Sequence, residues 1–235
     1  MSLFKRVEGV FTAPRQVFEA LAEKPVWVDV LIIVLIALIA HSFAVAPHMQ
    51  KDQLDLMRDN VKLRERMGDE AFNRMIANME NPSPARVFVQ TFVTMPLFVF
   101  AALLLQGLFL LVMSRFFTSE GRFIQVLAAL VHASLVDKLL GNAVRLVLAL
   151  ARKSVMQTST NLALLFPEVE VTSTAFAVLG QIDFFQLWMF GILAFGLSAI
   201  FKIELKKALA LSYSLWFLKA LINILMTVIG MSFLR

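Results

Sequence analysis

Five long apolar runs limit what this chain can fold into. A helix that crosses a bilayer needs about 20 mostly apolar residues, and five runs in the sequence approach or exceed this length. Hydrophobic residues make up 59% of the chain, against about 45–50% in a soluble domain. The sequence therefore predicts an all-α, polytopic membrane protein with one membrane domain over residues 1–235. The five transmembrane helices are expected at residues 28–46, 87–113, 123–150, 184–201 and 208–234.

The first 25 residues are amphipathic and are expected to form an interfacial segment, 1–25, in the headgroup layer. Thr12 is positioned to cap a second helix that has Pro14 in its first turn. The apolar stripe expected on the first helix consists of Leu3, Phe4, Val7 and Phe11. The expected membrane-interface anchors are Lys5, Arg6, Arg15, Lys24 and Trp27. A plain surface helix packed on the protein is the alternative.

The polar segment 49–84 is expected to form a helical insert outside the membrane. Gly68 divides it into two predicted helices, and the sequence NPSP ends it. Its methionines, together with His48, raise the possibility of copper binding, because thioethers suit soft metals. Methionine is also ordinary filler on an apolar helix face, and no Met-x-Met or His cluster is present. We therefore expect no metal and no cofactor.

Polar residues interrupt the third and fifth apolar runs. Charged side chains at bilayer depth are costly, so they face the bundle interior and have partners. The residues that we assign to a candidate intramembrane polar core are His132, Asp137, Lys138, Asn142, Arg145, Lys219 and Asn223.

Asp137 and Lys219 lie near the middle of their runs and should reach a similar depth, which predicts that they pair. Neutralisation of Asp137 by Lys138 or Arg145 is the alternative. Adjacent residues point about 100° apart on a helix, so Asp137 and Lys138 are not expected to face each other. Arg145 is close enough to the helix end to extend outward to the interface. A pair of this kind serves either as a structural contact or as part of a path for substrate or protons.

Signatures of enzymes and of nucleic-acid binding are missing from the sequence. We find no Walker, GxGxxG or HExxH motif, and His132 and Ser134 point to opposite sides of one helix. The net charge of +5 accompanies no nucleic-acid-binding motif and instead fits attraction to anionic lipid. We therefore expect a protein without enzyme activity that contacts membrane lipids and no nucleic acid.

The distribution of Lys and Arg predicts a cytoplasmic N-terminus and a C-terminus on the outer side. With that orientation, the short inner segments contain nine basic residues, whereas most basic residues of the outer segments lie among acids in the insert. The nine inner residues are Lys5, Arg6, Arg15, Lys24, Arg115, Arg122, Lys202, Lys206 and Lys207.

Three stretches, taken in order, resemble one known family. The sequence VFTAPRQVFEALAEKPVW (10–27) resembles the opening of bacterial Yip-domain proteins. The sequence GRFIQVLAALVHASLVDKLLGNAVRLV (121–147) resembles their third span. The sequence IDFFQLWMFGILAFGLSAIFKIELKKALALSYSLWFL (182–218) resembles their fourth span and the basic turn into the fifth. The chain is thus similar to the Yip family, the Ypt/Rab-interacting proteins and their prokaryotic relatives, and looks like the prokaryotic branch.

The resemblance implies five spans, a cytoplasmic N-terminus and a place in a bacterial inner membrane. Eukaryotic members act in trafficking with Rab GTPases, but the long N-terminal region of those proteins is missing here, so Rab binding is not expected. Relatives often carry a proline in the third span where this chain reads Leu-Val-Asp-Lys at 135–138. The resemblance leaves the biochemical role of the bacterial branch undefined. We expect a non-enzymatic protein that organises membrane or partner proteins and self-associates. The alternative is a small transporter or channel that uses Asp137, Lys219 and Asn223.

Overall fold

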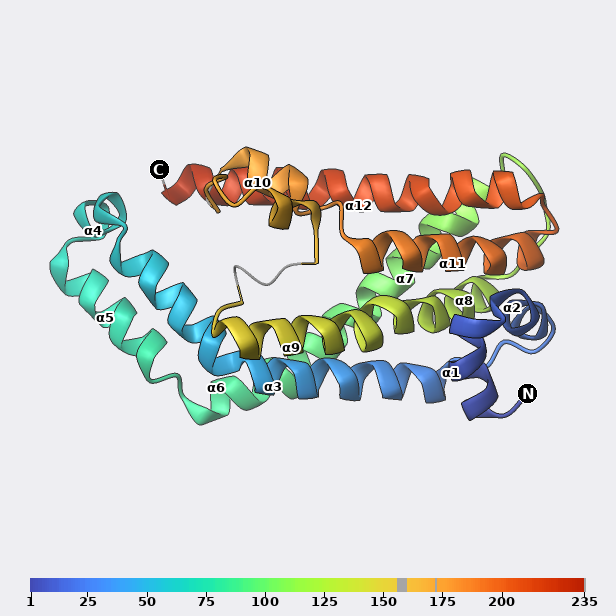
Figure 1. Ribbon diagram of the computed structural model, residues 1–235, viewed down its shortest axis with the longest axis horizontal. Helices are drawn as coiled ribbons and strands as arrows, with labels where there is room; N and C mark the ends of the chain where they lie inside the picture. The colour runs from blue at the N-terminus through green and yellow to red at the C-terminus, as the bar shows by residue number, and fades with distance from the viewer. Residues whose placement is uncertain (156–159, 172, 235) are drawn as a thin grey trace. The chain divides into compact units, whose positions relative to one another are not determined.

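The computed structural model describes residues 1–155, 160–171 and 173–234, and these are helical over most of their length (Figure 1). The α-helices are α1 (Leu3–Thr12), α2 (Pro14–Glu23), α3 (Val28–Arg58), α4 (Val61–Met67), α5 (Asp69–Glu80), α6 (Pro84–Val89), α7 (Met95–Ser114), α8 (Phe123–Leu135), α9 (Asn142–Arg152), α10 (Thr174–Leu179), α11 (Phe184–Phe201) and α12 (Leu205–Leu234). Two π-helical segments, η1 (Gln90–Thr94) and η2 (Val136–Gly141), and the 3-10 helix η3 (Leu162–Leu165) complete them. In these ranges the only extended pairing is an isolated bridge between Asn161 and Asp183.

Five helices are long and apolar enough to cross a membrane, which confirms the predicted fold class. Helices form here because a backbone in lipid has to satisfy its hydrogen bonds internally. The helices of this length and composition are Val28–Arg58, Pro84–Ser114, Phe123–Arg152, Phe184–Phe201 and Leu205–Gly230.

The first span continues further than its apolar run. Helix α3 passes through Pro47 and ends at Arg58, so its last turns form the start of the expected insert. The rest of the insert is α4 and α5, which Gly68 separates in a left-handed backbone conformation with φ of 77°. A residue with a side chain would be strained at this φ, and glycine is therefore the residue that allows the break.

Two spans contain a π-helical turn. In the second span, η1 directly precedes α7, one turn before Pro96. Proline lacks an N–H group and its ring clashes with the carbonyl four residues earlier, which explains a widened turn at that point. In the third span, η2 separates α8 from α9 and contains Asp137.

The chain divides into two compact units. Unit 1 comprises Met1–Leu38, Pro96–Asn142 and Phe184–Lys219, and unit 2 comprises the described parts of Ile39–Met95, Ala143–Asp183 and Ala220–Arg235.

Helix α8 lies at the centre of unit 1, because every residue from 126 to 137 is buried. Helix α11 packs against both α2 and α8. Its Gly196 makes this close approach possible, since a Cβ atom there would lie 2.9 Å from the Ala129 Cβ atom and 2.9 Å from the Phe18 ring. Small residues at helix contacts in membranes allow backbones to approach in this way.

The amphipathic N-terminal segment differs from its predicted pattern. Thr12 is the last residue of α1 and donates to the Glu8 carbonyl, while Ala13 precedes α2 without a side-chain cap. Phe4 of the expected apolar stripe is 76% exposed, as a residue facing lipid would be. The residues of α1 that are buried are Arg6, Gly9 and Val10. Of these, Gly9 faces α2, which α1 approaches closely at that point, since a Cβ atom there would lie 2.5 Å from a Val17 methyl group.

Unit 2 is held partly by polar contacts of α3. The Gln50 Nε2 atom donates to the carbonyl oxygens of Met79, at 2.7 Å, and Glu80, at 2.8 Å. Arg58 forms an ion pair with the Glu80 side chain. The Ser154 hydroxyl donates to the Asp52 carboxylate at 2.9 Å. These contacts fix α3 against the end of α5 and against the segment that follows α9.

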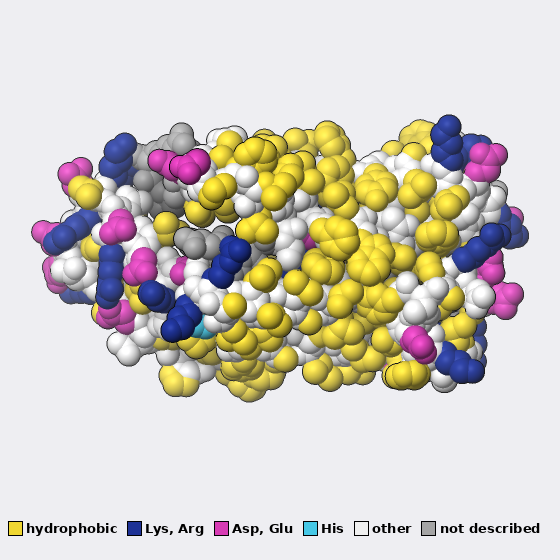
Figure 2. Space-filling view, in the orientation of Figure 1, with side chains coloured by type: hydrophobic (Ala, Val, Ile, Leu, Met, Phe, Trp, Pro, Cys, Tyr) yellow, Lys and Arg dark blue, Asp and Glu magenta, His cyan; other side chains and the backbone are white. Residues whose placement is uncertain are grey.

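The surface is segregated by chemistry. On the face that Figure 2 shows, hydrophobic side chains cover much of the spanning helices. Charged side chains gather over α4 and α5 in unit 2, and around α1, α2 and the turn between α11 and α12 in unit 1. This pattern fits helices that face lipid with their sides and water with their ends.

Gly196→Ala is expected to destabilise unit 1 by about 1–3 kcal/mol, because the added methyl group overpacks the contact among α2, α8 and α11. Thermal unfolding in detergent micelles would measure the loss. Gly230→Ala is the matched control, since nothing lies within 4 Å of a Cβ atom there. Equal stability of the two variants would contradict this packing.

Candidate functional site

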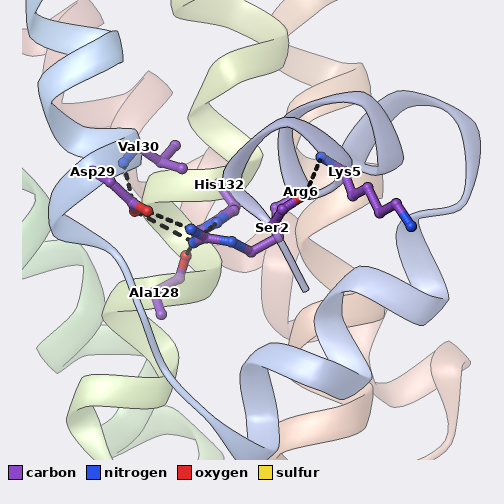
Figure 3. Close-up of polar contacts among 7 residues, drawn as sticks. All are labelled: Ser2, Lys5, Arg6, Asp29, Val30, Ala128 and His132. Atoms are coloured by element: carbon purple, nitrogen blue, oxygen red, sulfur yellow. Dashed lines mark hydrogen bonds and ion pairs between the residues drawn. The ribbon is translucent and has the colours of Figure 1, made fainter.

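Arg6 is a buried cation in unit 1. Its side chain is 6% exposed and reaches from α1 to the first turn of α3, where it forms an ion pair with Asp29. Both terminal nitrogens take part, Nη1 towards Oδ1 at 3.3 Å and Nη2 towards Oδ2 (Figure 3). Such a two-pronged contact is the geometry in which a guanidinium binds a carboxylate most specifically. The Asp29 Oδ1 atom also accepts from the Val30 N–H at 2.9 Å.

His132 completes this buried cluster from the last turn of α8. The imidazole is fully buried, with Nε2 3.2 Å from Arg6 Nη1 and Nδ1 2.8 Å from the Ala128 carbonyl oxygen. A guanidinium can only donate and a carbonyl can only accept. The contacts therefore require a neutral ring that accepts at Nε2 and carries its proton on Nδ1. The neighbouring Lys5 points away from the cluster (Figure 3).

The cluster is suited to holding helices together. The Nε2 lone pair is occupied by Arg6, whose guanidinium stays protonated, so the ring has no lone pair left to act as a base. The Arg6 Nε atom is buried and has no hydrogen-bond partner in the described part of the chain. Three segments distant in the sequence, α1, the start of α3 and α8, are joined at this point.

Asp137 lies in η2 and is 1% exposed. The Lys138 Nζ atom is 2.8 Å from its Oδ2 atom. We did not expect these neighbours to meet, because regular α-helical geometry separates them. The wider π-helical turn and the long lysine side chain account for the difference. The alternative that Lys138 neutralises Asp137 thus has direct geometric support.

Lys219 and Asn223 each bond to a glutamine. In unit 1, Lys219 Nζ donates to the Gln186 Oε1 atom at 3.0 Å. In unit 2, Asn223 Nδ2 donates to the Gln181 Oε1 atom at 3.1 Å. The pairing of Lys219 with Asp137 stays a prediction.

Arg145, expected to reach the membrane interface, has a carboxylate partner from another segment of the chain. It lies in unit 2, where its Nη2 atom is 2.8 Å from Asp183 Oδ1 and its Nε atom donates to Thr160 Oγ1 at 3.0 Å. The Thr160 hydroxyl in turn donates to Asp183 Oδ2 at 2.6 Å. The carboxylate before α11 therefore provides the partner that water or headgroups would otherwise have provided. Asn142, the first residue of α9, is half-buried in unit 1.

The expected interface anchors fall into two groups. Lys5, Arg15 and Lys24 are exposed, in keeping with a position among headgroups. Arg6 is a correction, because it is buried in the cluster with Asp29 and His132. Trp27 is half-buried and stacks on Phe100 of α7, with ring centroids 5.9 Å apart and planes 17° apart.

Sequence reasoning missed three acceptors. Asp29, Asp183 and Gln186 are the partners of Arg6, Arg145 and Lys219. The sequence does indicate that Asp29 and Gln186 have partners. Each is a polar residue within the first turns of an apolar span, where a polar group needs a hydrogen-bonding partner.

Arg6→Met is expected to lower stability by about 1–3 kcal/mol, because it leaves the Asp29 carboxylate and the buried His132 nitrogen without their donor. The loss is expected in the lower half of this range, since the Asp29 side chain is 39% exposed and water can replace part of the contact. Unfolding in micelles and protease sensitivity of α1 would report the effect. Lys5→Met on the same helix is the control, and equal behaviour of the two variants would contradict the cluster's role.

Comparison with known proteins agrees with this architecture. A family model described as the Yip1 domain matches residues 9–227, which include most or all of each span. No curated protein and no solved structure matches the chain. With a family match over most of its length and five helices of spanning length, the chain is an integral membrane protein that belongs to the Yip family.

Proposed function

We propose that this protein is a non-enzymatic organiser of the membrane that acts by self-association or by binding other membrane proteins. In this proposal it resides in a bacterial inner membrane with the N-terminus in the cytoplasm and the C-terminus outside. Its partners are lipids and membrane-spanning helices, with no role for nucleic acid or Rab GTPases. The basic residues of α1, α2 and the turn between α11 and α12 support the orientation.

One observation carries the proposal: the spans are buried very unequally. In the most apolar 18-residue stretch of the third span, 67% of the residues are buried, against 22% in the first, second and fifth spans. Large apolar side chains on the second span, such as Phe98 at 70% and Leu105 at 69%, are mostly exposed. Three spans therefore offer most of their surface to lipid or to the spans of another protein.

The polar groups of the interior support an organiser rather than an enzyme. Arg6 is joined to Asp29 and His132, Asp137 to Lys138, and Lys219 to Gln186. The contacts of Arg6 and Lys219 join different helices, and that of Asp137 lies within one helical turn. All three occupy charged groups that chemistry or transport would need.

The fifth span has a feature that favours a second copy of the chain as partner. Asn223 and Thr227 are both exposed on α12, one turn apart. One amide N–H of Asn223 bonds to Gln181 Oε1, and the residue is exposed. An asparagine amide both donates and accepts, so two copies of it can satisfy each other, and hydrogen bonds of this kind promote helix association in membranes.

The mass of the protein in polymer-bounded native membrane discs is expected to be a multiple of 26.4 kDa after correction for lipid. Asn223→Leu is expected to weaken association by about threefold to twentyfold, the range of an interhelical hydrogen bond in a membrane. Gln181→Leu removes the neighbour but keeps the amide and should leave association intact, as should Met226→Leu. A single-chain mass at every concentration would contradict self-association.

A small transporter or channel is the second candidate, and one observation favours it. Asp137 lies buried in a π-helical turn of the third span, and such turns occur frequently at functional sites. Ion or solute flux into proteoliposomes, lost in Asp137→Asn and retained in Asn223→Leu, would support this function. An absence of flux for every solute class tested would favour the organiser.

A further inference from the structure

A hollow of about 870 Å³ lies in unit 1 where α2, the loop between α7 and α8, and the turn between α11 and α12 meet. Its volume is in the range of small-molecule sites, about 300–1,000 Å³. Phe195, Ile200 and Leu205 contribute apolar surface to it, and side chains of both charge signs surround that surface.

The walls of the hollow are held in place by local contacts. Arg115 Nη2 donates to the Gly121 carbonyl at 3.1 Å, and Gln125 Nε2 donates to the Ala22 carbonyl. Gly121 has φ of 88°, and a Cβ atom there would lie 2.5 Å from the Phe201 ring. The loop is therefore fixed against the end of α11, so little conformational freedom remains to be lost on binding.

The charges around the hollow are only partly paired within the chain. Arg15 Nε is 3.0 Å from Glu19 Oε1, and Lys202 Nζ is 3.4 Å from Glu120 Oε1. The other three charged groups of the lining, Arg122, Glu23 and Glu204, form no ion pair with any residue that the structure describes. One guanidinium and two carboxylates thus remain for a ligand with both an anionic and a cationic group.

The position of the hollow identifies the kind of ligand. Helices α7 and α11 end beside it and α8 and α12 begin there, so it lies at the depth of lipid headgroups. A guanidinium is well matched to phosphate, and carboxylates accept hydrogen bonds from a primary ammonium. No group of three or more His, Asp or Glu residues in the described ranges could hold a metal ion, which leaves an ammonium as the better cation.

We propose that this hollow binds the headgroup of a phospholipid that carries a primary ammonium, as in phosphatidylethanolamine. Arg122 contacts the phosphate, Glu23 and Glu204 accept from the ammonium, and the acyl chains follow the apolar surface into the bilayer. Choline headgroups lack N–H donors and bind more weakly. This site does not depend on self-association.

The test uses the full chain in vesicles of equal phosphatidylethanolamine and phosphatidylcholine content, extracted mildly, with retained lipids identified by native mass spectrometry. Phosphatidylethanolamine is expected in excess. Joint Glu23→Gln and Glu204→Gln substitution should reduce this preference by about tenfold, the effect of losing a charge-assisted hydrogen bond. Arg122→Gln should lower retention of both lipids. Lys62→Gln and Glu65→Gln on α4 are the matched controls and should change neither quantity.

The melting temperature of each variant is measured alongside. A variant that unfolds at the wild-type temperature but retains less lipid has lost binding at the hollow rather than its fold. Equal retention of the two lipids by the wild-type protein, or an unchanged preference in the double Glu variant, would overturn the proposal. Soluble phosphoethanolamine forms the last arm. If it raises the melting temperature while neither lipid is retained, the ligand is a soluble compound and the lipid assignment is wrong.

Discussion

The buried contact of Arg6 with Asp29 and His132 is the interaction on which the arrangement of unit 1 depends. A cation taken out of water is costly unless its partners satisfy it, and here they come from the first and third spans. The contact holds α1, an amphipathic helix that could otherwise lie on the membrane surface, against α3 and α8. With α1 held, α2 can bury Phe18 against α11 at Gly196. The third span, already the most buried, thereby becomes the centre of both apolar and polar packing.

Two properties of the molecule follow from this centre. Because unit 1 packs inward onto α8, the first, second and fifth spans keep most of their apolar residues unburied, and the proposed partners or lipids would bind there. Because α2 is fixed beside the loop ahead of α8 and the end of α11, those three elements enclose a hollow at headgroup depth. The proposed contacts with neighbouring spans and the proposed lipid-headgroup site therefore use different surfaces of the protein.

The spans could be predicted from the sequence because bilayer crossing depends on local composition, and Gly68 could be predicted because its break depends on local backbone geometry. Partners of charged residues could not be predicted in the same way. Arg6 has the same local pattern as an interfacial arginine, and only the distant Asp29 and His132 turn it inward. Arg145 likewise met Asp183, 38 residues further along the chain. Asp137 and Lys138 meet in a π-helical turn, and no local sequence pattern indicates that turn.

The protonation of His132 tests the central interaction most directly. In protein labelled with ¹⁵N-histidine, with His41 and His48 replaced by glutamine, solid-state NMR in lipid can distinguish the two ring nitrogens of His132. If Arg6 donates to Nε2, the ring is neutral near pH 7, with its proton on Nδ1 and an unprotonated, hydrogen-bonded Nε2. A proton on Nε2, in either the other neutral tautomer or the imidazolium, would show that Arg6 does not occupy this position and would contradict the account.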